Sequence, residues 1–351
     1  MKISTITFHW ATNYGAVLQA YALQKHLKLN AYETEIINYI PFRVRLIQTI
    51  MNIKNLKVSE FVKEYKINKF RQQCLSLSRK TFHTNSSLVK KYHDYDVCIC
   101  GSDQIWNEFF VLSAERKPTL SYYLNFVGHE KTRISYATSF GTNKLSPEVI
   151  NLAKPELAIF KDISVRENTG KAIIEDMGFN ATLVVDPTLL LESKIYENLI
   201  AKENIKKHYQ LFSYILHDNQ ITADKINNYI FDNFFDKSID KKYNKQPIGL
   251  IEWLYNVKNS RFVLTNSFHG AIFGIIFHKP FIVVPVEGSK MNDRIITLIN
   301  SVGLESRIVD TFDKNKIDKL MQETIDWEIV DSQLQVLRKS SAEFLEHSLR
   351  G

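Results

Sequence analysis

One histidine lies where a strand is predicted to end and a helix to begin. The apolar run Phe262-Val263-Leu264 indicates a buried strand, and Ser267 is a good helix N-cap. Residues 271–277 are expected to form an apolar helix before the next predicted strand at 281–284. At such a turn, backbone N–H groups and the positive end of the helix dipole attract anions. His269 could therefore meet an anion and move a proton, or it could simply satisfy the helix terminus.

Other polar signatures also follow predicted strands, at the ends where open α/β sheets bind ligands. Arg166 ends the strand in ISVREN, where a guanidinium can grip a carboxylate or phosphate or form a structural ion pair. Asp103 could orient a hydroxyl, act as a base, or cap a turn. Lys290 and Arg294 follow a later strand and are expected on the same rim as His269. The other candidates for substrate contact are Asn13, Tyr14, Gly15, Ser102, Gln104, Asn266, Ser267 and Gly270.

The usual signatures of nucleotide and metal sites are weak or missing. Asn13-Tyr14-Gly15 resembles a turn that lets a phosphate approach, but it lacks the G-x-G-x-x-G spacing and no P-loop lysine follows. Cys74, Cys98 and Cys100 show no C-x-x-C spacing with partner histidines. Because Cys98 and Cys100 alternate on one apolar strand, we predict that they are core residues. We expect no metal and no cofactor.

Strands and helices alternate along the chain and must position these residues. This order predicts a parallel sheet with helices on both faces. The predicted strands lie at 3–8, 35–38, 96–100, 133–139, 163–166, 182–185, 209–215, 262–264 and 281–284. The first predicted helix ends near Leu29, and further helices are expected in the region 42–91. The remaining predicted helices lie at 147–160, from 168 onward, and at 222–235, 248–256, 271–277, 294–302 and 331–348.

The length of 351 residues favours two α/β domains, because a single core of this size is unusual. The boundary is expected between Leu189 and His208. We predict an N-terminal Rossmann-like domain over 1–190 with a basic helical insertion at 42–91, and a C-terminal Rossmann-like domain over 191–330. A helix at 331–351 is expected to cross back over the first domain.

Composition narrows the class of protein. The chain is 44% hydrophobic and 24% charged, as in soluble globular proteins. No run approaches the roughly 18–20 apolar residues that a membrane span needs, and the start MKISTITFHW reads as a strand rather than a leader. We therefore expect a cytoplasmic protein.

The net charge of +7 is unevenly distributed. Between Phe42 and Lys91 there are twelve Lys or Arg residues against two acids, Glu60 and Glu64. Such a region could lie against anionic headgroups or a diphosphate carrier, or it could be a solvated helical face. The rest of the chain shows no nucleic-acid module, so nucleic acid is not an expected partner. A peripheral contact with the inner membrane face is one hypothesis, which charge reversal at Lys63, Lys66, Lys69 and Arg71 would test.

Six ordered motifs resemble the polysaccharide pyruvyl transferases. They are ATNYGAVLQAYAL (11–23), CGSDQIWN (100–107), SYATSFG (135–141), ISVREN (163–168), VVDPTLLL (184–191) and TNSFHGAIFGIIFHKP (265–280). Their order makes the resemblance specific, whereas any one alone would not be.

The resemblance implies two Rossmann-like domains facing across a cleft, as in GT-B glycosyltransferases, with the acceptor on the first domain and the donor on the second. It implies transfer of pyruvate from phosphoenolpyruvate to sugar hydroxyls as a ketal, without a metal or redox cofactor.

The family's basic residues match Arg166, His269 and, more loosely, Lys290. His269 would then act as acid or base, Asp103 would assist at the acceptor, and Arg166, Lys290 and Arg294 would bind the donor anion. The acceptor would be a surface-polysaccharide sugar, either linked to a lipid diphosphate or not.

Two other functions stay open. A GT-B glycosyltransferase would need a nucleotide-sugar site, for which Glu252 or Glu287 could hold the ribose. A non-catalytic glycan-binding relative would keep the fold without turnover.

Overall fold

The computed structural model describes residues 1–47, 58–205, 209–216, 221–236, 238, 242–243 and 248–350. Lys54 and Lys57 of the basic region and the boundary residue His208 lie outside this set. The chain divides into two compact units. Unit 1 comprises Met1–Leu191 and Leu337–Gly351, and unit 2 comprises Glu192–Val336.

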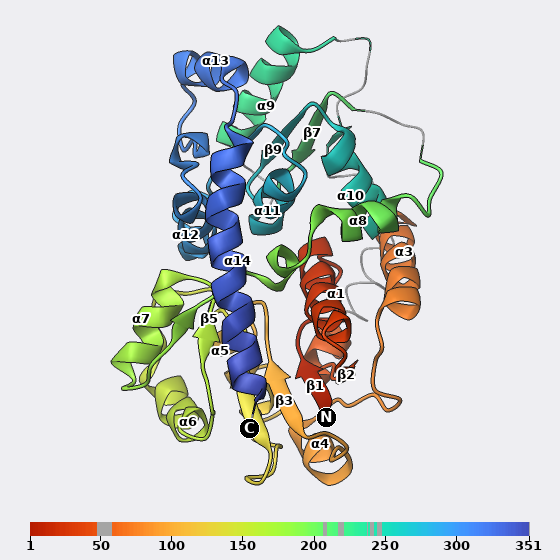
Figure 1. Cartoon of the computed structure of the whole chain (residues 1–351), viewed down its shortest axis with the longest axis vertical. Coiled ribbons are helices and arrows are strands. Elements are labelled where there is room, and N and C mark those ends of the chain that lie inside the picture. The colour runs from red at the N-terminus through yellow and green to blue at the C-terminus, as the bar shows by residue number, and fades with distance from the viewer. Residues whose placement is uncertain are drawn as a thin grey trace. The chain divides into compact units, whose positions relative to one another are not determined.

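Unit 1 is built on parallel strands (Figure 1). The first sheet has the order β2-β1-β3-β4, with β1 at Lys2–Ile6, β2 at Glu33–Ile36, β3 at Val97–Cys100 and β4 at Thr132–Ser135. A second pair of parallel strands, β5 (Ser164–Val165) and β6 (Thr182–Leu183), lies next to β4. Two isolated β-bridges connect it to this side of the sheet, one between Ile134 and Asp162 and one between Thr138 and Val165. Because β2 and β3 lie on opposite sides of β1, the strand order reverses there, and such a switch point is where open α/β sheets bind ligands.

The helices of unit 1 cover this sheet. In Figure 1, α1 (Tyr14–Leu29) lies beside β1 and β2, whereas α6 (Pro147–Leu157) and α7 (Asn168–Asp176) lie toward β5. The basic region is helical at residues 42–47, in α3 (Val58–Cys74) and in α4 (Asn85–Lys91), as predicted. The shorter elements are α5 (Glu108–Leu112), η1 (Ser121–Tyr123) and η2 (Pro187–Leu190).

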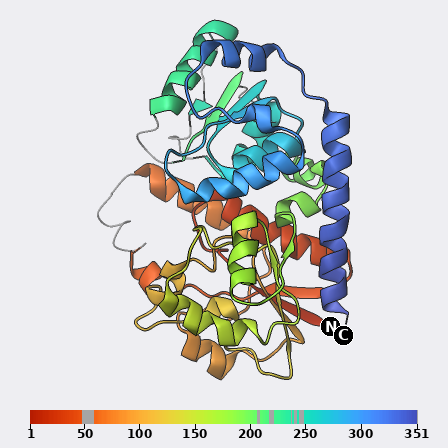
Figure 2. The same ribbon diagram turned by 90° about the vertical axis from the view of Figure 1, so that its left-hand side faces the viewer.

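Unit 2 repeats the architecture. Its four parallel strands have the order β10-β9-β7-β8, so the order reverses at β7. The strands are β7 (Leu211–Tyr214), β8 (Lys242–Tyr243), β9 (Phe262–Thr265) and β10 (Phe281–Val283). The helices are α8 (Ser193–Ile200), α9 (Ile221–Phe234), α10 (Leu250–Asn259), α11 (Phe268–Ile276), η3 (Lys290–Asn292), α12 (Asp293–Ser301), η4 (Glu305–Arg307) and α13 (Lys314–Gln322). Both views show α9 beside α13 (Figures 1 and 2).

The last helix, α14 (Trp327–Leu349), contributes its final turns to unit 1. There Val185 N donates to Ser341 Oγ at 2.9 Å, and Arg338 Nε donates to Leu189 O at 2.6 Å. Within the described ranges, no helix is both long enough and apolar enough to cross a membrane.

Most of the predicted elements are present, with boundaries shifted by a few residues. Cys98 and Cys100 are completely buried, which confirms the prediction that they are core residues. The strand predicted at 133–139 ends at Ser135, and Ala137 beyond it has a positive φ of 50°, which regular strand geometry does not allow. The short helix α5 was not predicted, because its sequence EFFVL is too short to show helical periodicity.

Candidate functional site

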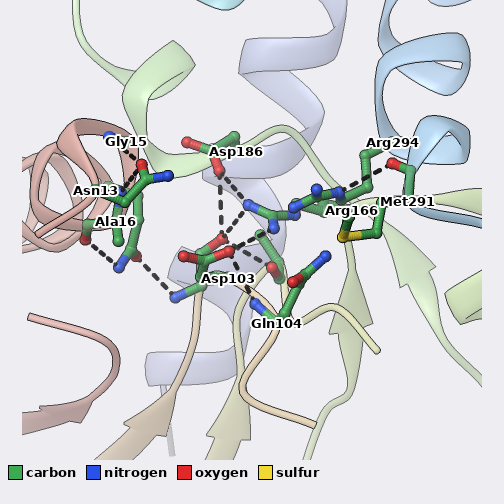
Figure 3. A network of polar contacts seen from close by, with 12 residues as sticks. Asn13, Gly15, Ala16, Asp103, Gln104, Arg166, Asp186, Met291 and Arg294 are labelled. Atoms are coloured by element: carbon green, nitrogen blue, oxygen red, sulfur yellow. Dashed lines mark hydrogen bonds and ion pairs between the residues drawn. The ribbon is translucent and has the colours of Figure 1, made fainter. Parts of the chain in front are cut away.

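Arg166 is the centre of a carboxylate network at the strand ends of unit 1 (Figure 3). Its Nη2 donates to Asp103 Oδ1 at 2.8 Å, and its Nη1 donates to Asp186 Oδ2 at 2.9 Å. A third carboxylate, Glu167, approaches Nε at 3.6 Å. These residues follow β3, β5 and β6, and parallel strands place all of their carboxyl ends at one edge.

The guanidinium of Arg166 is fully shielded from solvent. Burial disfavours its charged form, but the charges of Asp103, Asp186 and Glu167 outweigh this effect and raise its pKa above the ordinary value of an arginine. Of the two roles that the sequence left open, the ion pair is the one that these contacts describe. An anion binding directly to Arg166 would have to compete with carboxylates already in place.

Asp103 is the end of the network that reaches solvent, with its side chain 14% exposed. Its Oδ1 also accepts from the Gln104 backbone N–H at 2.9 Å. The backbone of Asp103 has a φ of 77°, an uncommon conformation for a non-glycine residue, and its carbonyl accepts from Ile105 and Ser139. The surrounding hydrogen bonds thus fix a strained residue, a feature that is enriched at functional sites.

A buried glutamine ties the first two strand-end loops together. Gln19 Nε2 donates to Thr7 Oγ1 at 2.8 Å, and Gln19 Oε1 accepts from Ser102 N at 3.1 Å. Thr7 Oγ1 in turn donates to Ser102 O at 2.9 Å. Ser102 itself is completely buried, and its hydroxyl donates to Ala137 O, so its contacts lie inside the unit.

Asn13, Tyr14 and Gly15 do not form an open phosphate-binding turn. Asn13 Oδ1 accepts from the N–H groups of Gly15 and Ala16 at 2.9 and 3.4 Å and caps α1 (Figure 3). Tyr14 is buried, and Lys63 Nζ lies 5.0 Å from the centre of its ring. The Asn13 side chain therefore already bonds the two N–H groups that an anion would need, and the motif serves to cap α1.

The carboxyl ends of β7 and β9 in unit 2 are joined by Asn266. Its side chain accepts from Leu216 N and donates to Leu216 O, both at 2.6 Å. Ser267 caps α11 as predicted, since its Oγ accepts from Gly270 N at 3.4 Å. A Cβ on Gly270 would overlap the Thr265 hydroxyl, so only glycine lets the helix start this close to the strand.

His269, on the first turn of α11, is 6% exposed and packs against the Phe268 ring with centroids 5.2 Å apart. The guanidinium of Arg294 lies over the same ring at 5.7 Å, and its Nε donates to Met291 O. Lys290, on η3, is exposed. Unit 2 therefore brings an imidazole and a guanidinium to one aromatic ring, at strand ends facing the same edge of the sheet.

Gln19 is the residue of the unit 1 network that the sequence reasoning missed. Its signal is that it is a polar residue inside the apolar stretch of α1. Glu167 and Asp186 stand directly after predicted strands, in the motifs ISVREN and VVDPTLLL, so the sequence indicates their place at the sheet edge but assigns them no role. Their partners, however, are distant in sequence and could not be assigned from local patterns.

No group of three or more His, Cys, Asp or Glu side chains is arranged to hold a metal ion within the described part of the chain.

Arg71, one of the cations of the basic region, is buried and donates to Ala11 O and Asn68 Oδ1. It therefore braces the loop after β1, and it does not belong to an exposed basic surface as the sequence had suggested.

Three solved structures illustrate the similarity of this fold to known proteins. The UDP-GlcNAc 2-epimerase from Neisseria meningitidis bound to UDP-GlcNAc is 10% identical with a TM-score of 0.56, and the match covers all of both chains. The UDP-GlcNAc 2-epimerase from Methanocaldococcus jannaschii is 13% identical with a TM-score of 0.54, over 97% of this chain and 100% of that one. The glycotransferase of kitacinnamycin is 10% identical with a TM-score of 0.50, over 99% of each chain. At these identities the likeness shows the fold alone, and it confirms the predicted GT-B-like class with two Rossmann-like domains.

No curated protein matches the sequence. The family model of the polysaccharide pyruvyl transferases matches residues 13–288, which is well over half of the chain and includes Arg166 and His269 but not Lys290 or Arg294. The chain therefore belongs to the polysaccharide pyruvyl transferase family.

Proposed function

We propose that this protein transfers pyruvate from phosphoenolpyruvate to two hydroxyls of a sugar in glycan biosynthesis, forming a ketal. The observation that carries the proposal is the placement of His269 and Arg294 on the same Phe268 ring, with Lys290 close by in sequence. A donor with a carboxylate and a phosphate needs cations, and its vinyl carbon needs a proton. An imidazole and a guanidinium that both contact one ring supply these two kinds of group.

The reaction then proceeds as an addition followed by a displacement. His269 protonates the terminal CH2 carbon of phosphoenolpyruvate, which becomes a methyl group, and the adjacent carbon becomes electrophilic. A sugar hydroxyl attacks that carbon and returns its proton to the imidazole of His269. A second hydroxyl attacks the same carbon, the bond from that carbon to the phosphate oxygen breaks, and phosphate leaves with the proton of this hydroxyl, which completes the cyclic ketal. Lys290 and Arg294 hold the donor and stabilise the negative charge of the leaving phosphate.

Asp103 and Arg166 have a different part in this scheme. The strand-end edge of unit 1 carries three carboxylates against one guanidinium, which disfavours a trianionic donor. We assign the acceptor to this unit, with Asp103 orienting a hydroxyl. Arg166 acts as a positioning residue, because its Nη2 holds Asp103 Oδ1.

Calorimetric titration with phosphoenolpyruvate tests the donor. The wild type should bind it, and Lys290→Ala and Arg294→Ala should each weaken binding about tenfold or more, since a hydrogen bond to a charged group contributes about 1.5–3 kcal/mol. Lys319→Ala on α13 is the matched control, because it removes an equal charge from an exposed lysine on another element. His269→Gln should retain binding and lose release of phosphate in the presence of sugar acceptors.

Absence of phosphoenolpyruvate binding by the wild type would overturn the proposal. A loss of affinity in Lys319→Ala as large as in Lys290→Ala would show that the effect is one of net charge rather than of this site. The competing function is nucleotide-sugar transfer. It predicts binding of UDP-GlcNAc that depends on Glu252, in the first turn of α10, or on Glu287, on the loop after β10.

We also propose that α3 contacts an anionic membrane surface, where a lipid-linked acceptor would lie. Phe61, Val62 and Tyr65 on this helix are 47%, 37% and 71% exposed. Lys66 and Lys69 are close to them in sequence, and Lys69 is exposed. Large apolar side chains combined with lysines on one helix are typical of surfaces that bind the headgroup region of a bilayer.

A further inference from the structure

Aromatic side chains gather where the two strand-end loops at the unit 1 switch point meet. Phe8 and Trp10 follow β1, with ring centroids 5.4 Å apart. Phe110 of α5 packs on Phe8 at 4.3 Å and on Trp10 at 6.4 Å, and Phe109 packs edge-on against Phe110 at 5.2 Å. We call Trp10, Phe109 and Phe110 the aromatic platform. Phe109 is 41% exposed, and Trp10 and Phe110 are partly exposed.

The platform is held rigidly by the core beneath it. Trp10 Nε1 donates to Tyr122 Oη at 3.4 Å, and the Tyr122 ring packs edge-on against both Phe8 and Phe110. Asn107 Oδ1 caps α5 by accepting from Phe109 N at 3.1 Å. Ring positions fixed in this way lose little entropy when a ligand binds, so exposed aromatic faces here are suited to recognition.

The charges around the platform favour a neutral ligand. In the loops 7–13 and 101–107 the only acidic or basic side chains are Asp103 and His9, and α5 begins with Glu108. His9 is uncharged at neutral pH, because burial lowers its pKa to about 4. The nearest cations, Arg71 and Arg166, are buried and already donate to Ala11 O and to Asp103. A nucleoside diphosphate would therefore meet the partly exposed carboxylate of Asp103 first, whereas a neutral sugar would not be repelled.

We infer that the aromatic platform binds a sugar ring of the acceptor. One face of a pyranose exposes C–H groups, which pack favourably on the electron-rich face of an aromatic ring. Its hydroxyls need hydrogen-bonding partners, and Asp103 lies on the loop 101–107 that leads into α5. The assignment rests on the proposed function for the identity of the acceptor. Trp10 and Phe109 are its specificity-determining residues.

Saturation-transfer NMR with methyl β-D-galactopyranoside, methyl β-D-glucopyranoside and methyl β-D-mannopyranoside tests this inference in the full-length protein. At least one glycoside should receive saturation on its ring C–H protons. Phe109→Ala should weaken that glycoside's binding roughly three- to tenfold, as expected for the loss of one aromatic contact. Phe312→Ala, on the loop before α13, removes a comparably exposed phenylalanine, 36% against 41%, and should leave binding unchanged. Trp10→Phe should retain part of the affinity that Trp10→Ala loses.

The outcomes separate the platform from the proposed donor chemistry. If no glycoside receives saturation, or if Phe109→Ala and Trp10→Ala bind as the wild type does, the platform assignment is wrong. UDP binding that depends on Trp10, without glycoside binding, would also overturn it in favour of a nucleobase. Glycoside binding that depends on Phe109, in a protein that fails to bind phosphoenolpyruvate, would support the platform and reject the donor.

Discussion

Replacing Arg166 with methionine should destabilise unit 1 strongly. The substitution keeps much of the side-chain volume but removes the cation from three carboxylates, of which Asp186 has a fully buried side chain. Removing one partner of a buried ion pair costs about 3–5 kcal/mol, because the remaining charge stays desolvated. At about 2–4 °C per kcal/mol for a domain of this size, the melting temperature of unit 1 should fall by about 6–20 °C.

Arg133→Met is the matched control for this measurement. Arg133 is also buried, but among the described residues it forms an ion pair with one carboxylate, that of Glu156, at 2.7 Å, and the Glu156 side chain is 21% exposed. Water can therefore solvate Glu156 after the substitution, and the loss of stability should be clearly smaller than for Arg166→Met. Adding Asp103→Asn to Arg166→Met should recover part of the loss, because a neutral amide tolerates burial better than a carboxylate.

Thermal melting combined with hydrogen exchange measures this effect in the correct unit. Peptides covering β3 report on unit 1, and peptides covering β9 report on unit 2. We expect Arg166→Met to lose protection at β3 but not at β9. A change below about 1 kcal/mol, or an equal cost for Arg133→Met, would refute the reasoning that the carboxylates depend on Arg166. The same expectation explains why Arg166 variants are unsuited to testing donor binding.

Two further predictions concern pH and membranes. His9 is buried with a pKa of about 4, below the ordinary 6.5, so the unfolded chain takes up a proton at higher pH than the folded chain does, and the free energy of unfolding should fall by about 2 kcal/mol between pH 7 and pH 5. Urea unfolding of His9→Gln should show a dependence on pH that is smaller by this amount. The same dependence on pH in His9→Gln and in the wild type would contradict this prediction. Co-sedimentation with vesicles containing phosphatidylserine should be reduced by two double variants on α3, Lys66→Glu/Lys69→Glu and Phe61→Ser/Tyr65→Ser. The double variant Lys90→Glu/Lys91→Glu on α4 is the control and should have little effect. Unchanged vesicle binding in both α3 variants would exclude this surface.

Local patterns were enough to find the elements and the residues at their ends. Ser267 was predicted to cap a helix from its residue type and its place between an apolar strand and an apolar helix, and it does so. The same reasoning predicts His269 where the strand ends and the helix begins, and it lies on the first turn of α11. Cys98 and Cys100 were predicted as core residues from alternation on an apolar strand. These features depend on neighbours within a few residues, so the sequence alone contains the information.

Only the tertiary structure decided which of these residues meet. Arg166 pairs with Asp103 and Asp186, which are 63 and 20 positions away, because the order of parallel strands brings their ends to one edge. Asn13 caps its own helix, and Arg71, which the sequence predicts on a basic surface, is buried against the loop after β1. The meeting of Trp10 with Phe110 likewise depends on β1 and β3 being adjacent. Partner choice over such distances follows from strand order and register, which residue type and spacing within one segment do not specify.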